Sequence, residues 1–183
     1  MIITTKTHAF FYTEWPSNFC KTKFVWTKFG ETHEFFCTEQ AFMWAKAKFF
    51  DDEETARKIL DVGYKPLDDG KPLMDPMTCK MLGREVKNYD DKAWDEVRYQ
   101  MFLEPNLERF RQDKVLQAKL LDPQFEGLTF VEASPFDKIW GCGLGMKTPI
   151  DELDNENLWQ GRNLLGKVIT ECRRVIKNEI HTN

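Results

Sequence analysis

Residues 128–145 read LTFVEASPFDKIWGCGLG, a short apolar run followed at once by a polar, glycine-rich loop. The apolar run, with Phe130 and Val131, predicts a buried strand. An acid beside an aromatic ring, on a backbone without bulky side chains, is typical of a loop that lies close to a sugar or a base. The alternative is a glycine-rich turn in which Asp137 only caps the backbone. The candidate residues of this loop are Glu132, Asp137, Trp140, Gly141, Gly143 and Gly145.

The rest of the chain is mostly helical in pattern. Aromatic and β-branched runs predict strands over 8–12, 23–29 and 34–37, and Thr38 is the expected N-cap of the next helix. Apolar spacing predicts helices over 39–50, 51–60, 76–86, 90–103, 105–121 and 157–180. This order of elements predicts a helix-dominated α+β fold with a small mixed or antiparallel sheet, in a single domain that spans residues 1–183.

Local signals predict where several of these helices begin and end. Asp51 with Glu54 resembles a capping box, and Asp75 and Asp90 are expected N-caps. Pro105 is expected to open a new helix, which Asp122-Pro123 then stops. Residues 61–71 and 148–155 are expected to form turns.

The composition is that of an ordinary globular protein of 183 residues, 42% hydrophobic and 31% charged. A net charge of −4 argues against a general nucleic-acid binder, because phosphates call for a basic surface. Five scattered cysteines without a Cys-x-x-Cys pair favour free thiols in the reducing cytosol over zinc or disulfides. The N-terminus lacks a signal-peptide pattern, and no run approaches the ~18 apolar residues of a membrane span. We therefore expect a cytoplasmic protein without a membrane partner.

Several common catalytic motifs are absent from the sequence. It contains no phosphate-binding P-loop, no Rossmann fingerprint and no serine nucleophile elbow. His8, His33 and His181 are isolated, so each is expected to be structural or exposed rather than a general base. Carboxylates near aromatic rings suit a transition state with positive charge at a sugar carbon, and a lysine of lowered pKa can attack a sugar C1 to form a Schiff base. Both chemistries act at an anomeric carbon.

Two of the expected helices carry residues that suit a ligand. Glu39 and Lys46 lie two turns apart on one helix face, about 10 Å along its axis. The alternative is that both are solvated ends of an amphipathic helix. Gly161 and Gly166 fall in the last helix and would each weaken it by about 1 kcal/mol relative to alanine. This cost indicates that something packs close to the backbone there.

Taken together, these segments resemble the NADAR (YbiA-like) family in an order that agrees over most of residues 10–176. No single segment is specific, but the combination is. The matching segments are Ser17-Asn18-Phe19, Thr38-Glu39-Gln40-Ala41, Lys46-Ala47, Lys80, Leu82-Gly83-Arg84, Trp94, Leu120-Leu121, Glu132-Ala133-Ser134, Asp137, Trp140-Gly141-Cys142-Gly143 and Trp159-Gly161-Asn163-Leu164-Gly166.

The resemblance implies a YbiA-like α+β fold and hydrolysis of N-glycosidic bonds in ribose-phosphate compounds. Members of the family act on phosphoribosylamino-pyrimidine intermediates of riboflavin biosynthesis, and others remove ADP-ribose from guanine bases in nucleic acid. NAD-derived metabolites have also been proposed as substrates. For some members a Schiff base between a lysine and the ribose is known. The leading interpretation is an N-glycoside hydrolase without a metal or a cofactor.

The resemblance also implies roles for individual residues. Glu39 is expected to act in catalysis or bind ribose, Lys46 is the first candidate nucleophile and Lys80 the second, and Asp137 is the acid/base or a ribose ligand. Trp140 and Trp94 are expected to stack on the base, Arg84 to hold a phosphate through its two-pronged guanidinium, and Asn18 and Asn163 to hydrogen-bond ribose or base edges. The alternatives are that Trp94 belongs to the core and that Arg84 only pairs with an acid. The other expected substrate-binding residues are Ser17, Phe19, Glu132, Gly141, Trp159 and Gly161.

Two alternatives to a small-molecule hydrolase stay open at this point. One is a non-catalytic protein that senses or sequesters ADP-ribose or a related nucleotide. The other is a hydrolase that acts on ADP-ribosylated nucleic acid, which the acidic charge balance disfavours. Residues 63–78 also form a longer and more Pro/Gly-rich segment than the family pattern leads us to expect, which leaves the individual substrate open.

Overall fold

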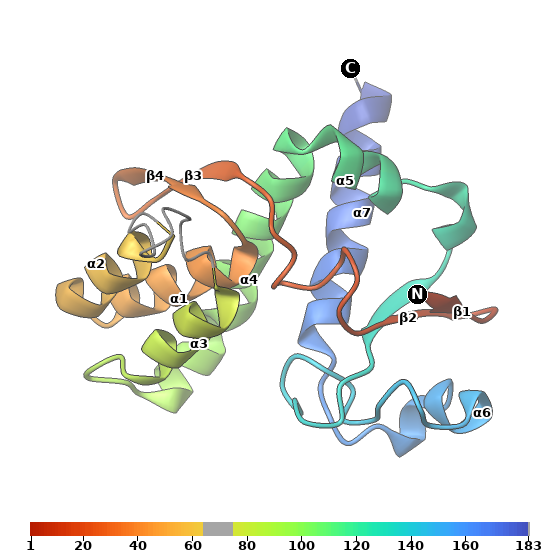
Figure 1. The fold of residues 1–183 in the computed structure, drawn as a ribbon. Coiled ribbons are helices and arrows are strands. Elements are labelled where there is room, and N and C mark those ends of the chain that lie inside the picture. Colours follow the sequence, from red (N-terminus) through yellow and green to blue (C-terminus); the bar gives the residue numbers. More distant parts are fainter. Residues whose placement is uncertain (64–74, 183) are drawn as a thin grey trace, which may run out of the picture. The chain divides into compact units, whose positions relative to one another are not determined.

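The structure is a computed structural model that describes residues 1–63 and 75–182. Much of the turn expected over 61–71, and of the long segment 63–78, lies outside these described residues. The chain divides into two compact units, which are considered one at a time (Figure 1). The first combines residues 1–20 with 114–183, and the second consists of residues 21–113.

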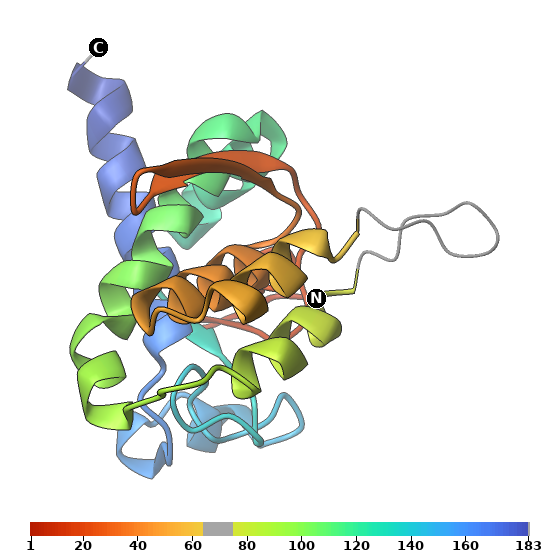
Figure 2. The same ribbon diagram turned by 90° about the vertical axis from the view of Figure 1, so that its left-hand side faces the viewer.

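The second unit is built around the helix α1 (Thr38–Phe49). Helices α2 (Glu53–Asp61), α3 (Pro76–Arg84) and α4 (Asp91–Gln112) all pack against α1. The antiparallel hairpin of β3 (Phe24–Lys28) and β4 (Glu31–Phe35) lies on the side of α1 opposite α3 (Figure 2). Aromatic side chains fill the space between these elements, among them Phe24, Trp26, Phe35, Phe42, Trp44, Trp94 and Phe102.

The first unit contains a mixed three-stranded sheet in the order β1-β2-β5. The strand β2 (His8–Phe11) pairs antiparallel with β1 (Ile3–Thr4) and parallel with β5 (Thr129–Glu132). The long helix α7 (Leu164–Thr182) packs against β5 through an apolar face with a helical period. The remaining elements are α5 (Lys114–Leu120), the 3₁₀ turns η1 (Pro123–Phe125) and η2 (Glu156–Leu158), and α6 (Ile150–Leu153). The prediction of a helix-dominated α+β fold with a small mixed sheet is confirmed.

The capping predictions are confirmed at two positions and wrong at two. The side chains of Asp75 and Asp90 accept hydrogen bonds from backbone amides two and three residues further along the chain, as expected. The helix α2 is capped by Asp52, whose Oδ1 accepts from the Thr55 amide at 3.1 Å, and not by Asp51. Asp51 has a φ of +56°, which places it in the turn between α1 and α2. Thr38 lies inside α1, whose N-cap position is held by the preceding cysteine.

Two helix boundaries also differ from the prediction. Pro105 does not open a helix, because α4 runs continuously from Asp91 to Gln112 through it. Proline removes one helical hydrogen bond, and buried side chains on both sides of it, Phe102 and Phe110, hold the helix in one piece. The last helix begins at Leu164 and not near residue 157, because residues 160–165 donate backbone hydrogen bonds to the loop at 138–142. Residues 150–153, expected as turn, form the single helical turn α6.

Candidate functional site

The predicted site residues fall into both units. The second unit holds Glu39, Lys46, Lys80, Arg84 and Trp94, and the first holds Ser17, Asn18, Phe19, Glu132, Asp137, Trp140, Gly141, Trp159, Gly161 and Asn163. Each group is described within its own unit.

Helix α1 carries Glu39 in its first turn and Lys46 two turns later. The Glu39 carboxylate is buried, with 3% of the residue exposed. This burial contradicts the alternative that Glu39 is a solvated helix end. Lys46 is half-buried, and its Nζ donates a hydrogen bond to the carbonyl oxygen of Gly83 at 2.8 Å. The same Nζ lies 4.2 Å from the centre of the Tyr89 ring, a cation–π contact.

The charge on Lys46 is destabilised by its surroundings. Burial lowers the pKa of its ammonium group below the ordinary value, and the positive charges of Arg98 and Arg84 act in the same direction. The negative charges of Asp91 and Glu39 offset part of this lowering. Lys46 therefore reaches its neutral, nucleophilic form at a lower pH than an ordinary lysine does.

Three residues that act on Lys46 were not predicted from the sequence: Tyr89, Asp91 and Arg98. The hydroxyl of Tyr89 donates to Oδ1 of Asp91 at 2.6 Å, and the guanidinium of Arg98 donates to the same oxygen at 2.9 Å. Burial and the hydrogen bond to Asp91 raise the pKa of Tyr89 to about 12. Asp91 and Arg98 are two turns apart on α4, so the seven-residue spacing was a visible signal of a pair on one helix face.

Gly83 brings α3 close enough to α1 for its carbonyl to reach Lys46. A Cβ at this position would meet the Met43 side chain on α1, with the sulfur only 1.9 Å away. On the same helix Lys80 is half-buried, and Arg84 is exposed, with a guanidinium nitrogen 3.6 Å from the sulfur of Met81. Arg84 therefore adds a solvent-accessible positive charge near Lys46, as a phosphate ligand would require.

Trp94 belongs to the core and not to a ligand-binding surface. Only 3% of it is exposed, and its ring centre lies 5.3 Å from Phe42, 5.7 Å from Phe49 and 6.1 Å from Phe50. These rings occupy the space that a base would need. The expectation that Trp94 stacks on a ligand is therefore corrected.

In the first unit, Asp137 caps its own loop. Its Oδ1 accepts from the backbone amides of Ile139 at 2.9 Å and Trp140 at 2.7 Å. This is the capping arrangement that was the alternative to a catalytic role. The half-buried Glu132 ends β5, where its carbonyl oxygen accepts from the amides of Ser134 and Cys142. The loop is thus folded tightly back on the end of the strand.

The glycines of this unit let two backbone segments touch. A Cβ on Gly161 would lie 2.2 Å from the carbonyl oxygen of Gly141, and one on Gly141 would lie 2.8 Å from the carbonyl oxygen of Asp137. A Cβ on Gly166 would lie 2.1 Å from the carbonyl oxygen of Phe130. The expected close approach to the backbone is confirmed at Gly161 and Gly166, and the partner at both positions is the chain itself.

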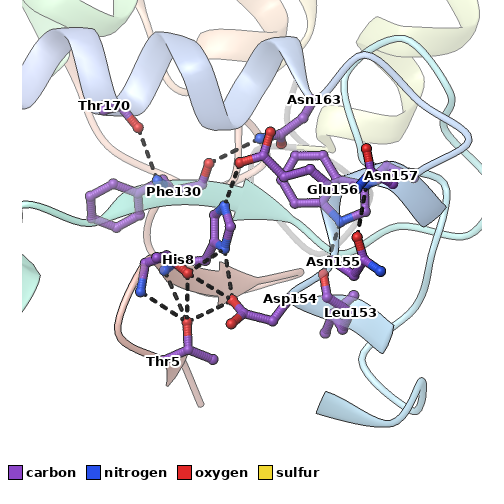
Figure 3. A network of polar contacts seen from close by, with 12 residues as sticks. Thr5, His8, Phe130, Leu153, Asp154, Asn155, Glu156, Asn157, Asn163 and Thr170 are labelled. Carbon is purple, nitrogen blue, oxygen red and sulfur yellow. Dashed lines mark hydrogen bonds and ion pairs between the residues drawn. The ribbon is translucent and has the colours of Figure 1, made fainter. Parts of the chain in front are cut away.

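Asn163 connects the start of α7 to β5. Its Oδ1 accepts from the Glu132 amide at 3.0 Å. Its Nδ2 donates to the Phe130 carbonyl oxygen at 3.1 Å (Figure 3). The residue is 1% exposed and has a φ of +50°, a conformation that asparagine tolerates better than most residues. Its amide is engaged by the strand, which corrects the expectation that it binds ribose or base edges.

The last predicted residues of this unit also have structural surroundings. The indole Nε1 of Trp159 donates to the Leu153 carbonyl oxygen at 2.8 Å, and the centres of the Trp159 and His8 rings lie 5.3 Å apart in an edge-on contact. Ser17 is buried, and its Oγ accepts from the Phe19 amide at 3.2 Å, so it shapes the turn at 17–19. Asn18, Phe19 and Trp140 are half-buried and keep part of their surface accessible.

Among the residues that the structure describes, no group of three or more His, Cys, Asp or Glu side chains is placed to hold a metal ion. None of the described helices combines the length and the apolar character needed to cross a membrane.

The fold is a helix-dominated α+β arrangement of the YbiA type. The solved structure of E. coli YbiA matches 99% of this chain and 91% of its own, with a TM-score of 0.67 at 22% identity, which bears on the fold alone. Residues 4–177 match the NADAR domain, and the chain belongs to that family.

Two curated relatives are similar in sequence. N-glycosidase R617 of Acanthamoeba polyphaga mimivirus is 35% identical over 143 residues, which cover 78% of this chain and 75% of that protein. Protein irg-1 of Caenorhabditis elegans is 32% identical over 142 residues, which cover 76% of this chain and 60% of that protein. The resemblance stated from the sequence motifs is confirmed.

Proposed function

We propose that this protein hydrolyses the N-glycosidic bond of a ribose-phosphate compound, with Lys46 as the nucleophile. The family and the name of the mimivirus relative, N-glycosidase, support the reaction class. The observation that carries the choice of residue is the half-buried position of Lys46 against the Gly83 carbonyl and the Tyr89 ring, surroundings that lower its pKa. Phosphoribosylamino-pyrimidines, ADP-ribosyl-guanine and NAD-derived compounds are the substrate classes that we propose for testing.

A second lysine on the same helix shows what makes Lys46 different. Lys48 lies in α1 between the carboxylates of Glu31, at 2.6 Å, and Glu53. The hydrogen bonds to Glu31 and Glu53 raise the pKa of Lys48. The direct contacts of Lys46 are a carbonyl oxygen and the face of a ring, neither of which carries a full charge. Lys48 is therefore held as a cation by its neighbours, whereas Lys46 is the better nucleophile of the two.

The proposed reaction needs one water and no cofactor. The lone pair of Lys46 Nζ forms a bond to C1 of the ribose while the bond from C1 to the base breaks, and the base leaves with that electron pair and takes up a proton. Nζ loses a proton, and opening of the ribose ring gives a Schiff base. Addition of water to C1 and loss of the amine then release the sugar and restore Lys46. Glu39 is proposed to offset positive charge that develops at C1.

The other residues are proposed to bind the substrate. Arg84 would hold a phosphate, because its guanidinium is exposed and always charged. Tyr89 is proposed as the aromatic contact for the base in place of Trp94, since 43% of it is exposed beside Lys46. Lys80 is kept as the second candidate nucleophile. Asp137 is proposed to shape its loop through the two amides that it caps.

The test is to incubate the protein with the three substrate classes in parallel and to follow released base and, after borohydride reduction, sugar adducts on lysine by mass spectrometry. We expect base release, an adduct on Lys46, and loss of both in Lys46→Arg, which keeps the charge but forms no Schiff base. Lys48→Arg is the matched control on the same helix and should keep both. An adduct on Lys80 would reassign the nucleophile. Tight binding without base release would refute hydrolysis and favour the sequestering alternative.

A further inference from the structure

His8 is the first residue of β2 and is almost completely buried, with 3% of it exposed. Its Nδ1 lies 2.7 Å from Oδ1 of Asp154, and its Nε2 lies 3.0 Å from Oε1 of Glu156 (Figure 3). Two carboxylates therefore meet the two nitrogens of one ring. No role in the proposed reaction has been given to this group.

The partners of His8 are carboxylates that belong to a second segment of the chain. Oδ1 of Asp154 also accepts hydrogen bonds from the hydroxyls of Thr5 at 2.7 Å and Thr7 at 3.2 Å, which lie just before β2. Burial acts to raise the pKa of Asp154, but hydrogen bonds from Thr5, His8 and Thr7 outweigh it and hold that pKa below its usual range. Asp154 is therefore an ionised acceptor shared by these three residues.

The contacts of His8 lead to the loop that contains Asp137 and Trp140. Asp154 and Glu156 flank the turn between α6 and η2, and Trp159, at the end of η2, packs on the His8 ring. The next two amides, of Gln160 and Gly161, both donate to the Cys142 carbonyl oxygen at 2.9 Å. Residues 162–165 continue this pairing with residues 138–141.

We infer that His8 is a positioning residue: by bridging Asp154 and Glu156 it fastens residues 153–159 to β2 and thereby holds the loop at 137–143 in place. This inference goes beyond the proposed function, because it concerns how the loop is held within the first unit. The groups that face the ring are the carboxylates of Asp154, from the end of α6, and Glu156, from η2, and the neutral Thr7 and Trp159.

The first test measures hydrogen exchange of the backbone amides of residues 160–165, without any substrate. Glu156→Ala removes one contact of His8 at an exposed side chain and avoids the folding risk of His8→Gln. We expect exchange at 160–165 to accelerate on the order of tenfold in Glu156→Ala, because the ring loses one of its two carboxylate partners. Glu152→Ala, an exposed carboxylate on α6, is the matched control and should leave exchange unchanged. Unchanged exchange in Glu156→Ala would overturn the inference.

The second test uses a conservative variant. Glu156→Gln keeps a side-chain oxygen that can accept a hydrogen bond from the His8 ring, so it should keep most of the wild-type protection at 160–165. A loss of protection in Glu156→Gln as large as in Glu156→Ala would overturn the inference.

Discussion

A single methyl group at Gly166 should show how tightly α7 is packed on β5. An alanine Cβ there would lie 2.1 Å from the Phe130 carbonyl oxygen and 2.5 Å from Oδ1 of Asn163. Carbon–oxygen contacts of this kind ordinarily begin at about 3.3 Å, so the helix and the strand would have to separate by roughly 1 Å. Both atoms are fixed, because Asn163 is itself hydrogen-bonded to the strand.

Two effects of opposite sign compete in Gly166→Ala. Alanine gains about 1 kcal/mol over glycine inside a helix. Overpacking against immobile atoms costs about 1–3 kcal/mol and occasionally more. We expect a cost of overpacking near the upper end of that range, about 3 kcal/mol. After the gain of about 1 kcal/mol from alanine is subtracted, the free energy of unfolding should fall by about 2 kcal/mol. For a chain of this size the corresponding fall in Tm is roughly 4–8 °C.

Gly83→Ala is the matched comparison. Its Cβ would lie 1.9 Å from the sulfur of Met43, but a methionine side chain is flexible and can turn away. Urea unfolding followed by tryptophan fluorescence and far-UV circular dichroism should therefore show a smaller loss for Gly83→Ala than for Gly166→Ala. Equal losses in the two variants, or a Gly166→Ala protein as stable as the wild type, would refute the reasoning.

Three further predictions concern single positions. Asp91→Asn removes a negative charge that raises the pKa of Lys46. Borohydride trapping on Lys46 should therefore become efficient at a lower pH than in the wild type, and a shift to higher pH would contradict Lys46 as the nucleophile. Trp94→Ala should cost about 3–5 kcal/mol of stability in urea unfolding and leave the KM of the folded protein unchanged; a raised KM at full stability would return Trp94 to the site. Asp52→Ala should remove a helix cap and lower the free energy of unfolding by about 1 kcal/mol. Thermal unfolding of both variants should show a much smaller loss for Asp51→Ala, and the reverse order would contradict the assigned cap.

Helix caps could be predicted from the sequence where a few adjacent residues determine them. Asp75 and Asp90 each accept a hydrogen bond from an amide within three residues, so their capping role needs no knowledge of the fold. The helix boundary predicted at Pro105 was wrong. The cost of one missing hydrogen bond can be read from the sequence, whereas the burial of neighbouring side chains that offsets this cost depends on the tertiary fold. The predicted start of the last helix was wrong for the same reason, since residues 160–163 form hydrogen bonds with a loop some twenty residues earlier in the chain.

The same distinction between local and tertiary features applies to the candidate site. The spacing of Glu39 and Lys46 follows from the helical period, and the structure bears out that both lie on α1. Tyr89 was not predictable, because its contact with Lys46 depends on how the segment before α4 packs against α1. Gly161 correctly indicated a close approach to the backbone, but a glycine does not say whether a ligand or the chain itself fills the space.

The environment of Lys46 shows how such local features combine into a chemical property. Gly83 lets α3 approach α1, which supplies a carbonyl oxygen but no carboxylate to the ammonium group. The Asp90 cap sets where α4 begins, and the buried Arg98 two turns into that helix adds a positive charge that lowers the pKa of Lys46. If Lys46 were only a structural lysine, a paired carboxylate such as those around Lys48 would stabilise it better. A half-buried amine whose direct partners are uncharged is the arrangement that a Schiff-base nucleophile requires, because it has to lose its proton before it can react.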